Sequence, residues 1–157
     1  MKYRRIILLP LVFVLACAAK STIYVPAAKI TLTASKALQF ASTSADSAYA
    51  NQLLTGVQLN HIRGVLLPAA TATQSAENVL LVWTEDSAPP QLHAMLDAIQ
   101  AAIADLTAFL PESSTKSIIL THLETARTLA ELLLSNFISA TKSTIYVPAA
   151  KITLTAS

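Results

Sequence analysis

The spacing of apolar residues constrains this chain more than any other feature, because they recur every three or four positions from about residue 26 to residue 141. This spacing places apolar side chains on one face of an α-helix. Only two glycines occur among the 157 residues, so few positions favour a break in a helix. The pattern therefore predicts an all-α fold.

Four stretches carry the pattern, and each has one apolar face. The first face comprises Ala27, Ile30, Ala34, Ala37, Ala41, Ala45, Ala48 and Gln52. The second comprises Leu59, Ile62, Leu66, Ala69, Thr73, Ala76, Leu80 and Trp83. The third comprises Leu92, Met95, Leu96, Ile99, Ile103, Leu106, Phe109 and Leu110. The fourth comprises Ile119, Leu123, Ala126, Leu129, Ala130, Leu133, Phe137 and Ile138. Because no such helix is stable alone in water, residues 26–141 are predicted to form an up-down four-helix bundle.

Breaks in the pattern separate the four stretches. Gly56 follows the first stretch, residues 84–91 with two prolines follow the second, and Pro111 ends the third. Asp86 or Ser87 is predicted to cap the third helix, with the proline pair in its first turn.

The second stretch has two further features. Pro68 lies inside it, so we expect either a kink near residues 64–67 or two shorter helices. Trp83 ends it and is predicted to cover one end of the bundle.

After the third stretch, residues 112–115 offer caps for the fourth helix.

The N-terminus has the three parts of a secretory signal. Three basic residues near the start precede an apolar segment at residues 6–15, and small residues follow at 16–19. The apolar run of residues 6–19 is shorter than the ~20 residues that a transmembrane helix needs. Residues 1–16 are therefore predicted to be a signal peptide.

The stretch Val14-Leu15-Ala16-Cys17 resembles the lipobox of bacterial and phage-encoded lipoprotein precursors. In that family the cysteine thiol receives a diacylglycerol, and the chain is cut just before this residue. The resemblance implies that Cys17 is lipidated, that residues 17–25 form a tether, and that membrane lipid is a partner. Ala18 follows the cysteine, which by resemblance to Gram-negative lipoproteins implies the periplasmic face of the outer membrane.

Two other interpretations of the N-terminus stay open. Residues 16–18 also fit an ordinary signal peptidase site, which would release a soluble secreted helical protein. Alternatively, Cys17 is a small apolar residue in an uncleaved anchor. It is the single cysteine of the chain, so no disulfide framework is expected.

A sixteen-residue segment occurs twice without change, at residues 20–35 and 142–157. Packing fixes residue size and leaves identity free, so the match indicates a recent duplication and not convergence. The bundle topology puts both copies at the same end, where the second copy is expected to be a peripheral tail. Alternating apolar residues also give each copy some β propensity, although a proline limits any ribbon. A second hypothesis is that copy two occupies the place of copy one, in the same or a neighbouring molecule.

Candidate chemistry is sparse. The histidines, His61, His93 and His122, belong to no metal-binding spacing and lie one position off the apolar faces, so they are expected at the boundary or in solvent. The carboxylates of Asp97, Asp105, Glu124 and Glu131 are expected to face solvent, and Glu124 is expected to pair with Arg127. No catalytic residue, metal site or cofactor is predicted.

These features bound the function. Without residues 1–16, eight basic residues stand against nine acidic ones, so no basic surface for nucleic acid is expected. The sequence predicts a membrane-anchored lipoprotein of the cell envelope with a structural or interaction role, through self-association or another envelope protein. The alternative is a carrier of an apolar ligand, which would need an internal cavity; an enzyme is the weakest class.

Overall fold

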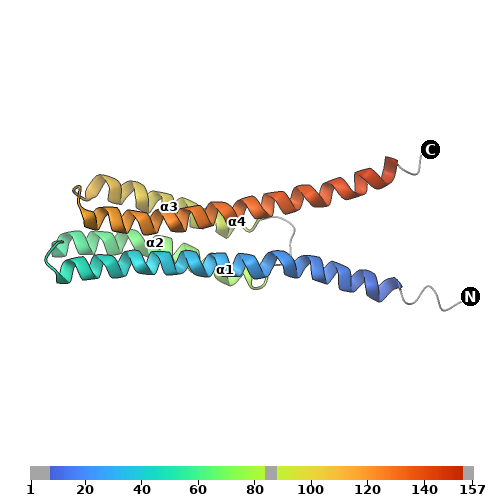
Figure 1. The fold of residues 1–157 in the computed structure, drawn as a ribbon, viewed down its shortest axis with the longest axis horizontal. Helices are drawn as coiled ribbons and strands as arrows, with labels where there is room; N and C mark the ends of the chain where they lie inside the picture. Colours follow the sequence, from blue (N-terminus) through green and yellow to red (C-terminus); the bar gives the residue numbers. More distant parts are fainter. Residues whose placement is uncertain (1–7, 84–87, 154–157) are drawn as a thin grey trace, which may run out of the picture.

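In the computed structural model, four α-helices follow one another up and down along a common axis (Figure 1). Helix α1 spans Leu8–Ala50, α2 spans Gly56–Leu80, α3 spans Pro90–Phe109 and α4 spans Ser114–Thr153. The structure describes residues 8–83 and 88–153, with side chains for residues 27–83 and 88–139. No strand occurs among the described residues. The predicted all-α four-helix bundle is confirmed.

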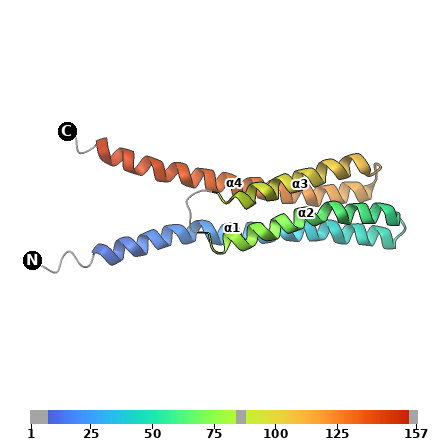
Figure 2. The ribbon, with the colours of Figure 1, turned by 180° about the vertical axis from the view of Figure 1, so that it is seen from behind.

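The helices form a closed ring. Each helix packs against its neighbour in the chain, and α1 also packs against α4. Helices α1 and α4 have 43 and 40 residues, against 25 for α2 and 20 for α3. The two long helices therefore continue past α2 and α3 towards both termini (Figures 1 and 2). The molecule is a rod with a four-helix part and a two-helix extension.

The core joins small residues of α1 to larger residues of the other helices. Alanines at positions 34, 41 and 45 of α1 are completely buried, as are Ile62 of α2, Ile99 of α3 and Leu123 of α4. Small side chains let helices approach closely, and the larger aliphatic side chains fill the remaining space. On α2, all seven predicted positions from Leu59 to Leu80 are buried.

Three residues predicted on apolar faces lie outside the core: Gln52, Phe109 and Ile138. Gln52 follows the end of α1 and has a left-handed backbone, with φ of 60°. Phe109 is the last residue of α3, and Ile138 lies beyond the level at which α3 covers α4. Each was misplaced because helical spacing does not show where a helix or its neighbour ends. Core positions that the spacing did not predict are Leu38, Leu54, Ala102 and Leu134, and the polar Thr31 is buried as well.

The turn between α1 and α2 has a cap on each side. The Leu53 N–H donates to the Ala48 carbonyl at 2.8 Å, and the Gln52 N–H donates to Tyr49 at 2.9 Å, which forms a Schellman motif. Thr55 then caps α2, because its hydroxyl accepts from the Gln58 N–H at 3.2 Å. The Gln58 side chain completes the capping box by accepting from the Thr55 N–H at 2.8 Å.

Helix α2 is continuous through Pro68, so the expectation of two shorter helices was wrong. A proline cannot donate to the carbonyl four residues earlier, which here belongs to Gly64. Both residues are exposed, and no atom outside the local helix lies within 4 Å of where a Gly64 Cβ would be. The helix therefore continues through Pro68 although the Gly64 carbonyl lacks its usual helical donor.

The remaining helix starts differ in how they are capped. Pro89 occupies the N-cap of α3, without a side-chain hydrogen bond, and Pro90 is the first helical residue. The cap was predicted at Asp86 or Ser87, which lie outside the described residues and before the observed start. At α4, the Ser113 hydroxyl accepts from the Lys116 N–H at 3.1 Å, within the segment predicted to supply a cap.

Both copies of the repeated segment are helical wherever the backbone is described, over residues 20–35 in α1 and 142–153 in α4. Ala27, Thr31 and Ala34 of copy one share a helix face and are buried. The Thr31 hydroxyl is satisfied there by donating to the Ala27 carbonyl at 2.8 Å. Tertiary packing of a helical face thus overrides the β propensity of the segment. Both copies lie at the end of the rod that carries the termini (Figure 2).

Candidate functional site

Cys17, the predicted lipidation residue, is in the N-terminal part of α1. This part of the helix projects beyond α2 and α3 (Figure 1). The Cys17 side chain is outside the described ones, and residues 17–25, the predicted tether, continue the backbone of α1 as helix. Ala27 is the first residue of α1 whose burial is described, ten positions later, which corresponds to about 15 Å along a helix. Residues 1–7 of the predicted signal peptide lie outside the described residues.

His61 joins α2 to α3. Its Nε2 lies within hydrogen-bond distance of Asp105 Oδ1, at 2.5 Å. Its ring also stacks on Phe109, with ring centroids 3.8 Å apart and planes at 28°. Asp105 and Phe109 are one turn apart on α3, so both can reach the same imidazole. This partly exposed histidine therefore stabilises a contact between helices, at the boundary position predicted for it.

The other two histidines are separate from this contact. His122 of α4 lies with its ring centroid 5.8 Å from that of Phe40 on α1, and His93 is exposed on α3. Among the described residues, no group of three or more His, Cys, Asp or Glu side chains is placed to hold a metal ion.

Lys116 is the one lysine whose side chain is buried within the described part of the chain, at 5% exposure. Its Nζ donates to the Thr107 carbonyl at 2.7 Å and to Glu112 Oε1 at 2.6 Å. Thr107 lies in the last turn of α3, where carbonyls lack helical donors and a positive charge is favourable. The lysine therefore caps α3 from the first turn of α4.

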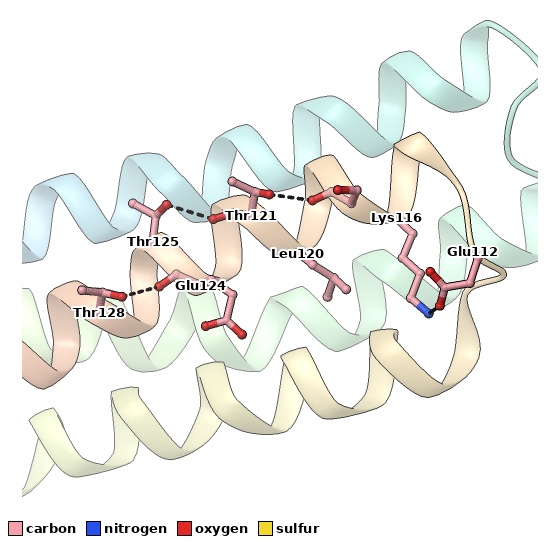
Figure 3. A pocket seen from close by; sticks show the side chains of 8 residues that line it. Glu112, Lys116, Leu120, Thr121, Glu124, Thr125 and Thr128 are labelled. Atoms are coloured by element: carbon pink, nitrogen blue, oxygen red, sulfur yellow. Dashed lines mark hydrogen bonds and ion pairs between the residues drawn. The ribbon is translucent and has the colours of Figure 1, made fainter.

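One groove lies along α4, beside its turn from α3, and measures about 510 Å³ (Figure 3). Thr121, Thr125 and Thr128 line it, and each hydroxyl donates to the carbonyl four residues earlier at 2.8–2.9 Å. Figure 3 also shows Lys116 turned away towards Glu112. Because these polar groups point to partners within the protein and not to a common centre, the groove offers no arrangement for catalysis.

A second groove of about 310 Å³ lies between α1 and α4, at the end of the rod opposite the termini. Three large apolar side chains line it and are half or more exposed: Phe40 at 57%, Leu53 at 65% and Ile118 at 50%. Its remaining lining is mainly Thr43, Ser44, Ser47, Asn51, Ser114 and Thr115. An exposed apolar group surrounded by polar residues is typical of a protein contact surface. We call this the distal groove.

The predicted pair of Glu124 and Arg127 is present on α4, with Oε2 and Nη2 2.8 Å apart. Arg127 also reaches Glu131, with Nε and Oε1 3.6 Å apart. The three side chains are partly exposed and lie on one helix, so they stabilise that helix only modestly. They form no site.

Directly after the C-terminal end of α2, two adjacent apolar residues, Leu81 and Val82, are 70% and 76% exposed. The Val82 N–H donates to the Val79 carbonyl at 3.1 Å, which holds this turn against the end of α2. Trp83 follows and is half-buried at the end of the bundle. We call residues 81–83 the proximal tip.

Comparison of the sequence with protein-family models gives no match, and searches of the curated proteins and of the solved structures give none either. Among the residues that the structure describes, no helix combines the length and the apolar character that crossing a membrane requires.

Proposed function

We propose that this chain is a small helical lipoprotein, anchored in a bacterial envelope through acyl chains on Cys17, with a structural or protein-interaction role. The observation that carries the proposal is the stretch Val14-Leu15-Ala16-Cys17, placed directly after a basic and apolar signal segment. More than one acyl chain, as this class of protein carries, is sufficient for stable anchoring, whereas a single chain is not. Ala18 favours the periplasmic face of an outer membrane.

The arrangement of the helices supports this role. Cys17 belongs to the N-terminal part of α1. That part lies at the end of the rod from which both termini leave (Figure 1), and the distal groove lies at the opposite end. Phe40 is 23 positions after Cys17 on the same helix, which corresponds to about 35 Å. An anchored rod would therefore hold the distal groove away from the bilayer, where another envelope protein could reach it.

The packing favours a scaffold over a carrier of an apolar ligand. On all four helices, the described residues that face the axis of the bundle are buried, and they form one continuous core. The grooves on the described surface are lined in part by Ser, Thr and charged residues. A carrier would instead need an enclosed apolar cavity between the helices.

Mass spectrometry of the mature N-terminus tests the anchor directly. We expect a chain that begins at Cys17 and carries the added mass of a diacylglycerol and, in most hosts, one further acyl chain. Incorporation of labelled palmitate in cells should be lost in a Cys17→Ser variant. An unmodified mature chain that begins after residue 16, or an intact chain that still begins at Met1, would contradict the proposal.

A further inference from the structure

We propose that the proximal tip is a second membrane contact, and that the bundle leans over so that Leu81 and Val82 enter the lipid headgroup region. This inference rests on the proposed anchor at Cys17. The tip has the two adjacent apolar side chains with the largest combined exposure among the described residues. Isolated exposed apolar residues need no explanation, but two neighbours held in a hydrogen-bonded turn form a defined contact.

The position of the tip points to lipid as its partner. Helix α2 has 25 residues and returns alongside α1 from the distal end, so its last residue, Leu80, lies at about the level of Ala27. The tip follows directly and is therefore in the part of the bundle nearest to Cys17, beside the start of the two-helix extension (Figures 1 and 2). A surface this close to acyl chains is held near the bilayer at all times.

The distances require the bundle to lean. An upright α1 would hold the tip about 15 Å above Cys17, because ten residues of helix separate the two levels. The headgroup layer is only about 5–8 Å thick on each side of a bilayer. The tip, however, directly follows α2. The axis of α2 stands about 8–10 Å to one side of α1. Tilting the rod towards α2 therefore lowers the tip into the headgroup layer without lengthening the tether.

The chemistry of the three residues fits an interfacial position. Leucine and valine gain free energy when their exposed apolar surface leaves water. Tryptophan is favoured at the level of the headgroups, where its ring meets an apolar phase and its N–H a polar one. The tip would thus add a protein contact to the acyl anchor and fix the direction in which the distal groove faces.

Trp83 makes this inference testable, because it is the single tryptophan of the chain. The experiment uses the acylated mature protein, which begins at Cys17, purified from membranes and placed in vesicles of phosphatidylethanolamine and phosphatidylglycerol. Some vesicles carry phospholipid brominated near the headgroup, which quenches nearby indole fluorescence. We expect Trp83 emission to shift to shorter wavelength on reconstitution and to fall roughly twofold in brominated vesicles.

The chain offers a matched control for the variant. A Leu81→Ser/Val82→Ser protein should lose the quenching while it still floats with the vesicles. A Leu53→Ser/Val57→Ser protein removes the same residue types at the distal end, where they are 65% and 74% exposed, and should be quenched like the parent. Circular dichroism of both variants checks that the helices are retained.

The outcomes separate this inference from the proposed function. A parent protein that floats with the vesicles but is not quenched by brominated lipid would overturn the tip contact and leave the anchor in place. Quenching that persists in Leu81→Ser/Val82→Ser would also overturn it. A parent protein that does not float would overturn the anchor and, with it, the contact.

Discussion

The imidazole of His61 and the carboxylate of Asp105 lie 2.5 Å apart across the interface of α2 and α3, although the two residues are 44 positions apart in the chain. The same imidazole stacks on Phe109, so a single side chain of α2 contacts two successive turns of α3. Both members of the polar pair are partly exposed, which limits the contribution of their charges. Solvent weakens the stacking of His61 on Phe109 less than it weakens the interaction of the charges.

We therefore expect the ring, more than the carboxylate, to stabilise this interface. His61→Ala should lower the free energy of unfolding by about 1–2 kcal/mol, because it removes the stacking and the polar contact together. Asp105→Asn should cost less than about 1 kcal/mol. Urea denaturation of the two single variants and the double variant measures the coupling between them. Equal effects of the two single variants would contradict the larger role of the ring.

A second prediction concerns the end of α1, where Gln52 has a positive φ of 60°. A residue with a Cβ is strained in this conformation by about 1 kcal/mol, whereas glycine is not. Gln52→Gly should therefore raise the unfolding free energy by up to about 1 kcal/mol and increase Tm by a few degrees. Ala50→Gly, at the last residue of α1 two positions earlier, is the control and should lower Tm, because glycine is a poorer helix former than alanine. A decrease in both variants would show that Gln52 is not strained.

A third prediction concerns the buried Nζ of Lys116. Lys116→Met keeps most of the apolar stem but leaves the Thr107 carbonyl without its donor. A hydrogen bond with a charged donor contributes about 1.5–3 kcal/mol, and thermal unfolding should show a loss of that size. Glu112→Gln changes the other partner of Lys116, which is 91% exposed, and should cost less than about 1 kcal/mol. If Glu112→Gln cost as much as Lys116→Met, the ion pair and not the carbonyl contact would hold the turn.

A fourth prediction tests the distal groove as a contact surface. Phe40→Ser/Ile118→Ser removes two of its exposed apolar side chains and should reduce chemical cross-linking to an envelope partner or a second copy several-fold in cells. The helix content of the variant should be unchanged. Leu67→Ser removes a side chain of similar exposure from the outer face of α2 and serves as the control. Equal cross-linking of the parent and the groove variant would exclude this surface.

The sequence pattern predicted the middle of the helices better than their ends. The face of α2 from Leu59 to Leu80 follows from spacing alone, because α2 packs against both α1 and α3 and all seven of its predicted positions are buried. Gln52 and Ile138 were misplaced because local spacing contains no information on where a partner helix stops. The contact of His61 with Asp105 and the distal groove could not be predicted, since each joins residues that are distant in sequence.

The two copies of the repeat, residues 20–35 and 142–157, allow the structural role of identical residues to be compared at two places in the chain. Ala27 and Ala34 of copy one are buried in the core. The corresponding side chains of copy two, Ala149 and Ala156, lie outside the described ones, so the described core contacts of the repeat all come from copy one. A chain that ends at Thr141 should keep its unfolding midpoint and its oligomeric state, measured by thermal denaturation and light scattering.

Replacing a residue of copy one should have the opposite result. Ala34→Leu puts three extra carbon atoms into a fully buried position and should destabilise the bundle by about 1–3 kcal/mol. Ala156→Leu, the same change in copy two, is the matched control and should leave Tm unchanged. If removal of residues 142–157 instead lowered stability or changed the oligomeric state, copy two would have a partner. Exchange with copy one of the same or a neighbouring molecule would then be the explanation to test, because the two sequences fit the same surface equally well.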